Sequence, residues 1–258
     1  MVSSPRMAGS SSPRLPRITI ATVVRNGART LADCIQSVVG QAYPDLEYLV
    51  IDGASTDGTL DVLRRFHGRI TRWVSEPDGG TYDAMNKATR MATGDFILFL
   101  GADDALLADL SDVAPRLADP RTIYYGDAFW PRSNRRYDGP FGARKLAVRN
   151  ICHQAIFYPR AVFERRSFDT RYRYQADWEL NMRCLSDPEL RFEYLPLVVA
   201  RYNDSDGAST RNRDLALEAD YPRLLWRHFP LHVAIPLAAL ALGGRALRAL
   251  GLRGGGSG

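Results

Sequence analysis

Residues 96–104 have the sequence FILFLGADD, in which five consecutive apolar residues are followed by a short spacer and two aspartates. A continuous apolar run of this length is typical of a strand that is buried on both faces of a sheet. The run predicts a central strand over Phe96–Leu100. Asp103 and Asp104 then lie just beyond its carboxyl end.

Three further apolar runs precede this strand, and a helix-forming segment follows each of them. The runs are Ile18–Val24, Leu46–Ile51 and Ile70–Ser75, and the third is followed by a predicted helix over about Tyr82–Met91. Strands that alternate with helices pair in parallel through right-handed crossovers. The sequence therefore predicts an α/β fold with a mostly parallel central sheet flanked by helices.

Acidic residues follow three of the predicted strands: Asp52, Glu76, Asp78, Asp103 and Asp104. In an open parallel sheet, ligands bind beyond the carboxyl ends of the strands. Carboxylates that lie close together repel each other, so they favour a hard cation such as Mg²⁺ or Mn²⁺, shared with a diphosphate. The alternative for Asp103 and Asp104 is an exposed acidic turn before a helix over Leu106–Leu110.

Composition and missing motifs exclude several function classes. The 258 residues are 45% hydrophobic, which suffices for one sizeable core. No GxGxxG follows the first strand and no GxxxxGK[ST] occurs, which argues against hydride transfer and P-loop chemistry. The net charge of +5 is scattered among acids, so we expect no nucleic-acid partner. Three distant cysteines favour a reduced, cytoplasmic location.

Four segments occur in a specific order: ITI and RN (18–20, 25–26), VIDGASTDGT (50–59), SEPDGGTYDAMNK (75–87) and GDFILFLGADD (94–104). With this order and spacing, the chain resembles glycosyltransferase family 2 over about residues 17–210. NICHQAIFY (150–158) and Ala176-Asp177-Trp178 resemble small bacterial enzymes of cell-surface glycan and glycolipid assembly, such as colanic acid and mycobacterial phenolic glycolipid transferases. The resemblance implies the GT-A fold, with a nucleotide-sugar half over about 17–104 and an acceptor half over about 105–210.

The resemblance also implies roles for individual residues. Asp103 and Asp104 correspond to the DxD-type acids, with Asp104 as the direct ligand of Mn²⁺ or Mg²⁺, and Asp177 matches the general base. The implied donor-binding residues are Thr22, Val24, Arg25, Asn26, Asp52, Asp78, Gly79, Asp83, Asn86, Lys87 and Asp103. Contacts with the acceptor or a phosphate are expected from His153, Gln154, Trp178 and Ser209, although a buried structural role is the alternative for His153.

The implied function is that of an inverting, metal-dependent glycosyltransferase. It would move a sugar from a UDP, TDP or GDP sugar to a glycan or lipid-linked acceptor, and it lacks the QxxRW signature of processive members. Ala176 stands where many relatives have Glu, and Asp206-Gly207-Ala208-Ser209 alters a Gly-Gly-x-Ser element. Two alternatives stay open: a nucleotide-sugar pyrophosphorylase, and a catalytically silent sugar-nucleotide-binding protein.

The ends of the chain differ in composition from its middle. Residues 1–16 are rich in Ser, Pro and Arg and are expected to form a flexible tail, and 254–258 to be a linker or cloning scar. Within 211–253, an apolar segment from Phe229 to Leu252 contains Pro236, which is expected to break it. The flanking arginines are Arg223, Arg227, Arg245, Arg248 and Arg253.

Only twelve residues separate His232 from Arg245 in that segment, too few to span a bilayer. We expect an interfacial helix that brings the protein to the inner face of the plasma membrane. The alternative is a helix that packs back on the domain or forms a homodimer interface.

Overall fold

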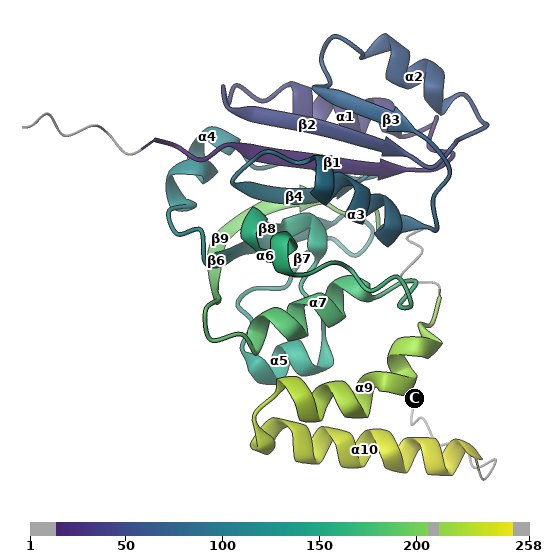
Figure 1. Cartoon of the computed structure of the whole chain (residues 1–258), viewed down its shortest axis with the longest axis vertical. Helices are drawn as coiled ribbons and strands as arrows, with labels where there is room; N and C mark the ends of the chain where they lie inside the picture. Colours follow the sequence, from purple (N-terminus) through teal and green to yellow (C-terminus); the bar gives the residue numbers. More distant parts are fainter. Residues whose placement is uncertain (1–13, 206–211, 250–258) are drawn as a thin grey trace, which may run out of the picture.

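A curled, mixed sheet runs through the computed structural model, which describes residues 14–205 and 212–249 (Figure 1). Its first half is parallel, with the strand order β3-β2-β1-β4. The strands are β1 (Ile18–Val24), β2 (Leu46–Asp52), β3 (Arg72–Ser75) and β4 (Phe96–Gly101). The crossovers contain α1 (Leu31–Val39), α2 (Thr59–Arg65) and α3 (Thr81–Met91). The predicted parallel half is confirmed.

The second half of the sheet mixes both strand directions. β8 (Ile156–Pro159) lies antiparallel between β4 and β6 (Thr122–Trp130), and β6 pairs in parallel with β9 (Arg191–Arg201). β5 (Ala105–Leu106) pairs antiparallel with β9, and β7 (Arg135–Tyr137) with β6. The predicted helix over Leu106–Leu110 is wrong: β9 recruits Leu106 into the sheet, and α4 (Leu110–Val113) begins only after Asp109 caps it. The short helix η1 (Ala114–Arg116) follows.

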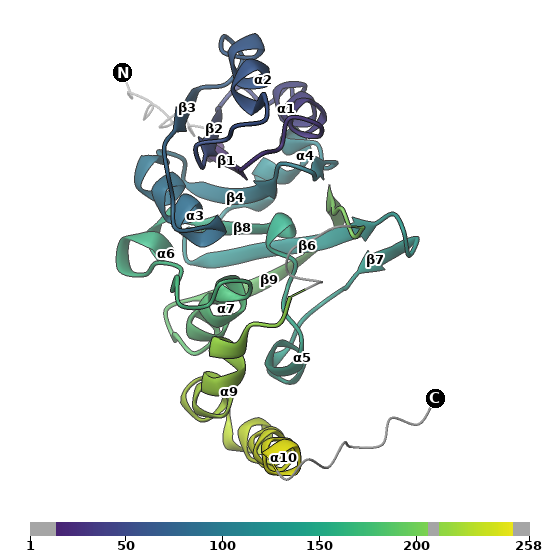
Figure 2. The same cartoon turned by 90° about the vertical axis from the view of Figure 1, so that its right-hand side faces the viewer.

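Helices cover both faces of the sheet, and a hydrophobic core lies on each side. One core contains the buried faces of α1 and α2, and the other contains those of α3 and α7 (Ala176–Leu185). Figure 2 shows α1 and α3 on opposite sides of the parallel strands. The remaining elements before the C-terminal helices are α5 (Ala143–Val148), η2 (His153–Ala155) and α6 (Arg160–Arg165).

Two helices, α9 (Leu215–His228) and α10 (Leu231–Ala249), extend the molecule beyond α7 (Figure 1). The predicted break at Pro236 is wrong, because α10 continues through it. The carbonyl of His232, which loses its helical partner there, belongs to an exposed residue that water can reach. Within the described residues, no helix is both long enough and apolar enough to cross a membrane.

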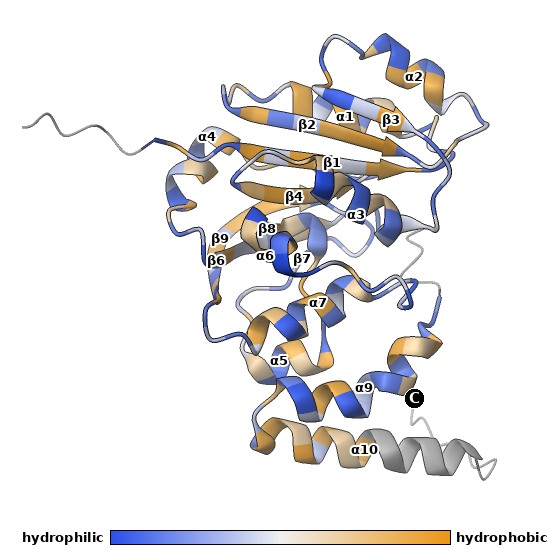
Figure 3. Ribbon diagram, viewed as in Figure 1, coloured by the Kyte–Doolittle hydropathy of each residue, from blue (hydrophilic) through white to orange (hydrophobic). Residues whose placement is uncertain are grey.

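One face of α10 packs back on the domain. Val233, Ala234 and Ala238 are buried in the same core as α7 and α9, whereas Leu231, Ile235 and Leu240 are exposed. Figure 3 shows the described part of α10 as mostly hydrophobic, in contrast to α9 with its many hydrophilic residues. The packing alternative therefore holds for one face, and a second apolar face stays uncovered.

Some predictions fall outside the described residues. These are residues 1–13 of the predicted tail, the Asp206-Gly207-Ala208-Ser209 element with its candidate residue Ser209, Arg253 and the segment 254–258. The side chains of Arg245 and Arg248 also lie outside the description.

A buried network joins the amino ends of β1, β2 and β4. Glu47 accepts hydrogen bonds from Thr19 Oγ1 at 2.6 Å and from the backbone and side chain of Thr93, both at 2.7 Å. Burial alone would raise the pKa of Glu47, but these donors outweigh it and hold the pKa below its usual value. Gly94 N completes the network by donating to Thr19 Oγ1 at 3.0 Å. An added Cβ at Gly94 would lie 2.5 Å from that oxygen and 2.7 Å from the Thr19 nitrogen.

We expect Gly94→Ala to destabilise the protein by about 1–3 kcal/mol, because the new methyl group overlaps a backbone atom that cannot rotate away. Urea unfolding followed by circular dichroism measures the effect. Gly68→Ala is the matched control, since a Cβ at Gly68 has nothing within 4 Å. Equal midpoints for the two variants would contradict the close packing at this corner.

Candidate active site

The loops after β1 and β2 interlock at the carboxyl edge of the sheet. Asn26 and Ala54 both have a φ of 55°, a left-handed backbone that is strained for residues other than glycine. Asn26 N donates to Ser55 Oγ at 2.7 Å, and Asn26 Oδ1 accepts from Thr56 N at 2.9 Å. Arg25 and Asn26 remain exposed beside this crossing. The crossing therefore fixes two of the predicted donor-binding residues at the edge.

Other predicted donor-binding residues of these strands are enclosed. Thr22 points into the core, where its hydroxyl lies 3.1 Å from Tyr48 Oη, and Val24 is buried. Asp52 reaches the edge but is buried, with Oδ2 accepting from Ser55 N at 3.1 Å and from Ser75 Oγ at 2.6 Å. In this structure, Asp52 therefore ties β2 to the neighbouring loops.

The loop after β3 forms a second, more open part of the edge. Asp83 Oδ2 accepts from Gly79 N at 2.9 Å, and Asp78 Oδ1 accepts from Gly80 N at 2.9 Å. Lys87 binds the Pro77 carbonyl at 2.8 Å and pairs with Glu76 at 3.1 Å. These contacts hold the loop against the first turn of α3.

Asn86 has a different role from the rest of that group. It is buried, and its amide bonds the backbone N and O of Phe168, both at 2.9 Å. Both polar atoms of the side chain are thus used to anchor a distant loop.

Asp103 and Asp104 follow β4, where they lie against the end of β9. Asp104 is only 2% exposed and accepts from Gln154 Nε2 and Asn203 N, both at 2.7 Å. Asp103 is half-buried and accepts from Asn203 Nδ2 at 2.9 Å. The alternative of an exposed acidic turn is therefore wrong for Asp104, because a backbone amide and a buried amide side chain enclose its carboxylate.

The two carboxylates are the candidate ligands of a shared cation. Burial raises the pKa of Asp104 above its usual range, and the neighbouring charge of Asp103 raises it further. Within the described residues, no cluster of three or more His, Cys, Asp or Glu could hold a metal ion. A pair of carboxylates whose cation is completed by the phosphates of a ligand matches the way Mg²⁺ is usually bound.

Asp177, in the first turn of α7, is held by three donors. Tyr82 Oη lies 2.6 Å from Oδ1, while Asn150 Nδ2 and His153 Nδ1 lie 2.7 and 3.1 Å from Oδ2. The carboxylate side chain is 8% exposed. Since Tyr82 comes from α3 and His153 from η2, Asp177 draws both halves of the domain together.

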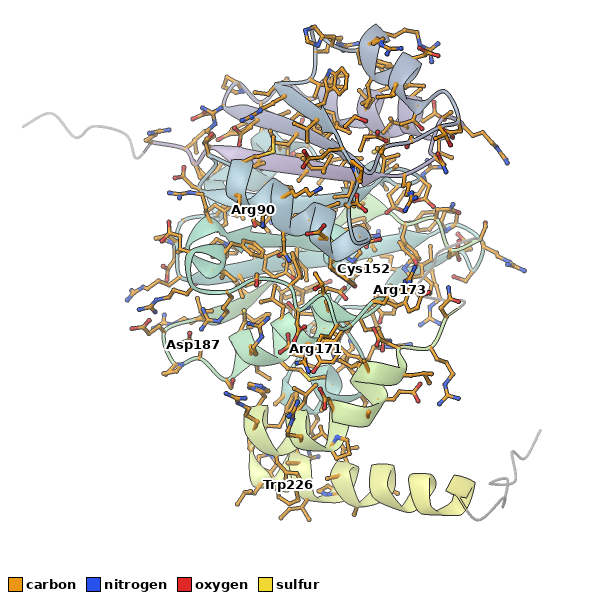
Figure 4. All side chains as sticks on the ribbon, turned by 45° about the vertical axis from the view of Figure 1, so that its right-hand side comes forward. Arg90, Cys152, Arg171, Arg173, Asp187 and Trp226 are labelled. Atoms are coloured by element: carbon orange, nitrogen blue, oxygen red, sulfur yellow. The ribbon has the colours of Figure 1, made fainter. Side chains whose placement is uncertain are left out.

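Adjacent residues of η2 contact the two acidic centres of the site, Asp104 and Asp177. His153 contacts Asp177, and Gln154 donates to Asp104. The Cys152 thiol donates to Gln154 Oε1 at 3.0 Å, which leaves Nε2 of that amide for Asp104. Burial keeps the pKa of Cys152 well above its usual value, so the thiol retains its proton. Figure 4 shows Cys152 in the middle of the molecule.

A cavity of about 280 Å³ opens beside Asp177. Its lining includes Trp130, Tyr137, His153, Tyr174 and Trp178. The rings of Trp130 and Tyr137 stack at 4.7 Å, and Trp178 Nε1 donates to the Leu146 carbonyl at 2.7 Å. Aromatic walls of this kind suit the apolar face of a sugar or another flat group.

Sequence reasoning missed three residues that organise the site: Tyr82, Asn150 and Asn203. Tyr82 and Asn150 lie inside segments that were singled out, but nothing local indicated that they would meet Asp177. Asn203 follows β9, so its position at a strand end was the available signal.

Comparisons with known proteins agree with this architecture. The family model described as glycosyl transferase family 2 matches residues 19–181. A PGL/p-HBAD biosynthesis glycosyltransferase of Mycobacterium bovis (strain BCG / Pasteur 1173P2) is 40% identical over 205 residues, covering 75% of this chain and 79% of its own.

Two solved structures share the fold. S. aureus TarS 1–349 in complex with UDP-GlcNAc has a TM-score of 0.60 at 16% identity, over 81% of this chain and 64% of that one. Mannosyltransferase PcManGT from Pyrobaculum calidifontis, in complex with GDP-Man and Mn²⁺, has a TM-score of 0.62 at 22% identity, over 95% of this chain and 79% of that one.

Proposed function

The chain belongs to glycosyl transferase family 2, and from this premise we propose that it is an inverting, divalent-cation-dependent glycosyltransferase that adds one sugar per encounter. The donor would be a nucleotide sugar. The acceptor would be a hydroxyl of a glycan or of a lipid-linked molecule.

This proposal rests on the way in which η2 links Asp104 to Asp177. His153 and Gln154 are consecutive residues, so the Asp104 and Asp177 carboxylates are held at a fixed separation across the edge of the sheet. One acid therefore lies where a donor diphosphate would bind, and the other beside the cavity that would take the acceptor. Transfer between two substrates needs this arrangement, whereas binding of a sugar nucleotide alone does not.

The chemistry assigns a task to each group. The acceptor oxygen attacks the anomeric carbon on the side opposite the leaving diphosphate, which inverts that centre. Asp177 and its partners receive the hydroxyl proton as the new bond forms. A divalent cation held by Asp103 and Asp104 would neutralise the charge that develops on the departing diphosphate. The loops that contain Arg25, Asn26 and Asp78 would hold the nucleotide and its sugar.

The relatives narrow the substrate classes. The TarS complex contains UDP-GlcNAc and the PcManGT complex contains GDP-Man, so UDP, TDP and GDP sugars are the donors to test first. The mycobacterial relative is a PGL/p-HBAD biosynthesis glycosyltransferase, which favours a cell-surface glycolipid or its precursor as the acceptor. Such chemistry would take place in the cytoplasm, at the inner face of the plasma membrane.

We expect donor binding to depend on the metal, because two neighbouring carboxylates repel a diphosphate unless a cation lies between them. A thermal-shift panel of UDP, TDP, GDP and CDP sugars with Mn²⁺ identifies the donor, and calorimetry with Mn²⁺ or EDTA then measures its affinity. Asp103→Asn should weaken binding in Mn²⁺ by about tenfold or more. Asp112→Asn, an exposed change on α4, is the control. Equal affinity in Mn²⁺ and EDTA would remove the metal from the proposal.

We expect Asp177→Asn to lower turnover by about 10²-fold or more while the donor affinity stays within about twofold, since the amide keeps the shape but cannot stabilise the proton that leaves the acceptor. Release of nucleoside diphosphate from the bound donor measures turnover. Asp112→Asn again serves as the control. A variant with near-normal turnover would place the proton acceptor elsewhere, with Glu76, Asp78 and Asp83 as the next candidates.

The uncovered face of α10 supports a peripheral membrane contact. Leu240 is 72% exposed and Trp226, near the end of α9, is 51% exposed; Figure 4 shows Trp226 beside α10, at the end of the molecule away from the parallel strands. The exposed arginines Arg223 and Arg227 flank this surface. Apolar side chains of an interfacial helix enter the headgroup boundary, and each nearby arginine contributes on the order of 1 kcal/mol on anionic lipid.

We expect the full chain to float with anionic liposomes at low salt and to lose this association in the double variant Ile235→Glu/Leu240→Glu, which places charge on the uncovered face. Leu107→Glu is the matched control, because Leu107 is also half-exposed but lies near the sheet. Size-exclusion chromatography tests the alternative of a dimer. A wild type that is dimeric and does not float, together with a monomeric double variant, would assign the face to a second copy of the chain.

A further inference from the structure

We propose that His153, supported by Asp177, receives the proton of the acceptor hydroxyl through its Nε2 atom. Asp177 would then be a positioning residue and His153 the catalytic one. This inference rests on the proposed transferase function and assigns the proton-transfer step within it to a particular atom.

The oxygens of Asp177 are already engaged by the protein. Oδ2 accepts from both Asn150 Nδ2, at 2.7 Å, and His153 Nδ1, at 3.1 Å, and Oδ1 accepts from Tyr82 Oη at 2.6 Å. A carboxylate oxygen has two lone-pair sites, so Oδ2 has none left for a substrate hydroxyl. The side chain is also 8% exposed, which restricts the approach of an acceptor to Oδ1.

A buried chain of amides fixes this arrangement. Asn150 Oδ1 accepts from Asn181 Nδ2 at 2.9 Å, and Asn181 Oδ1 accepts from Tyr158 Oη at 2.9 Å. Because the oxygen of Asn150 is committed to Asn181, its nitrogen must face Asp177. The carboxylate is therefore held in one orientation toward the histidine.

His153 is more open to the cavity than Asp177. Both side chains line the 280 Å³ cavity, but that of His153 is 22% exposed and that of Asp177 only 8%. An ionised carboxylate can only accept, so Nδ1 must carry the hydrogen that lies between the two residues. Neutral imidazole then has its lone pair on Nε2, and no hydrogen bond from the described residues occupies that atom. The Nε2 lone pair thus belongs to the more exposed of the two residues.

The acceptor oxygen forms its bond to the anomeric carbon while the bond between that carbon and the diphosphate oxygen breaks, and the electron pair leaves with the nucleoside diphosphate. The acceptor proton moves to His153 Nε2. The resulting imidazolium is stabilised by the Asp177 carboxylate, and it later returns the proton to water.

The charged and titratable groups around His153 come from several elements. Asp177 faces it from α7, and the charge of Asp104 acts on it from the loop after β4. Arg149 lines the same cavity but is paired with Asp138. Tyr137, Tyr174 and Tyr202 are the phenols of the lining, and Cys152 adjoins His153 in the chain. Asp177 is thus the acid in hydrogen-bond contact with the histidine, and Arg149 is already paired.

The tautomer can be measured without any substrate. Long-range proton–nitrogen correlation spectra of the full chain at alkaline pH should show His153 with hydrogen on Nδ1 and a free Nε2, and His153→Gln identifies its signals. Exposed His232 is the internal reference and should favour the ordinary Nε2–H form. A His153 ring with hydrogen on Nε2 would overturn the proposal, because it has no lone pair to offer the acceptor.

Turnover provides the second readout, measured as nucleoside diphosphate release from the donor found in the panel, with water as the acceptor. We expect His153→Gln and His153→Asn to lower kcat by about 10²-fold with unchanged donor affinity, and His232→Gln to have no effect.

Turnover of the His153 variants within about threefold of wild type would return the proton to Asp177 and overturn the proposal. A wild type that releases nucleoside diphosphate from no donor would instead refute the transferase function. The tautomer would still decide whether His153 offers a lone pair.

Discussion

The enclosure of Asp104 is the constraint on which the arrangement of the site depends. A carboxylate that is 2% exposed must be met by donors, and here these come from Gln154 Nε2 and from Asn203 N, which is 99 residues away in the sequence. Satisfying one buried acid therefore draws η2 and the end of β9 onto the end of β4. The mixed second half of the sheet is held against the parallel half at this point.

The same contact links the two proposed substrate sites. Gln154 is fixed on Asp104, so His153, one residue before it, is fixed on Asp177. A donor at the Asp103–Asp104 pair and an acceptor in the aromatic cavity would thus meet across a single turn of η2.

The parallel half of the fold could be predicted because its signals are local: apolar runs such as Phe96–Leu100 and capping residues between them. The second half depends on contacts between distant segments, so Leu106 was placed in a helix, whereas β9 draws it into the sheet. For the candidate site, strand-end acids and Asp177 were singled out from the sequence, but their partners Tyr82, Asn150 and Asn203 were not. A hydrogen bond between residues 82 and 177 leaves no periodic trace in the sequence. At Pro236 the prediction was wrong for the opposite reason. The proline is a strong local signal for a helix break, but the packing of α10 on α9 keeps the helix continuous.

We propose that a cation and the donor diphosphate meet at Asp103 and Asp104. Anomalous diffraction from crystals grown with Mn²⁺ and the nucleoside diphosphate of the preferred donor locates the ion. We expect a manganese peak at coordination distance from a carboxylate oxygen of this pair and from the diphosphate, with the Gln154–Asp104 contact retained. A diphosphate bound at this edge without the ion, or manganese at another site, would contradict it.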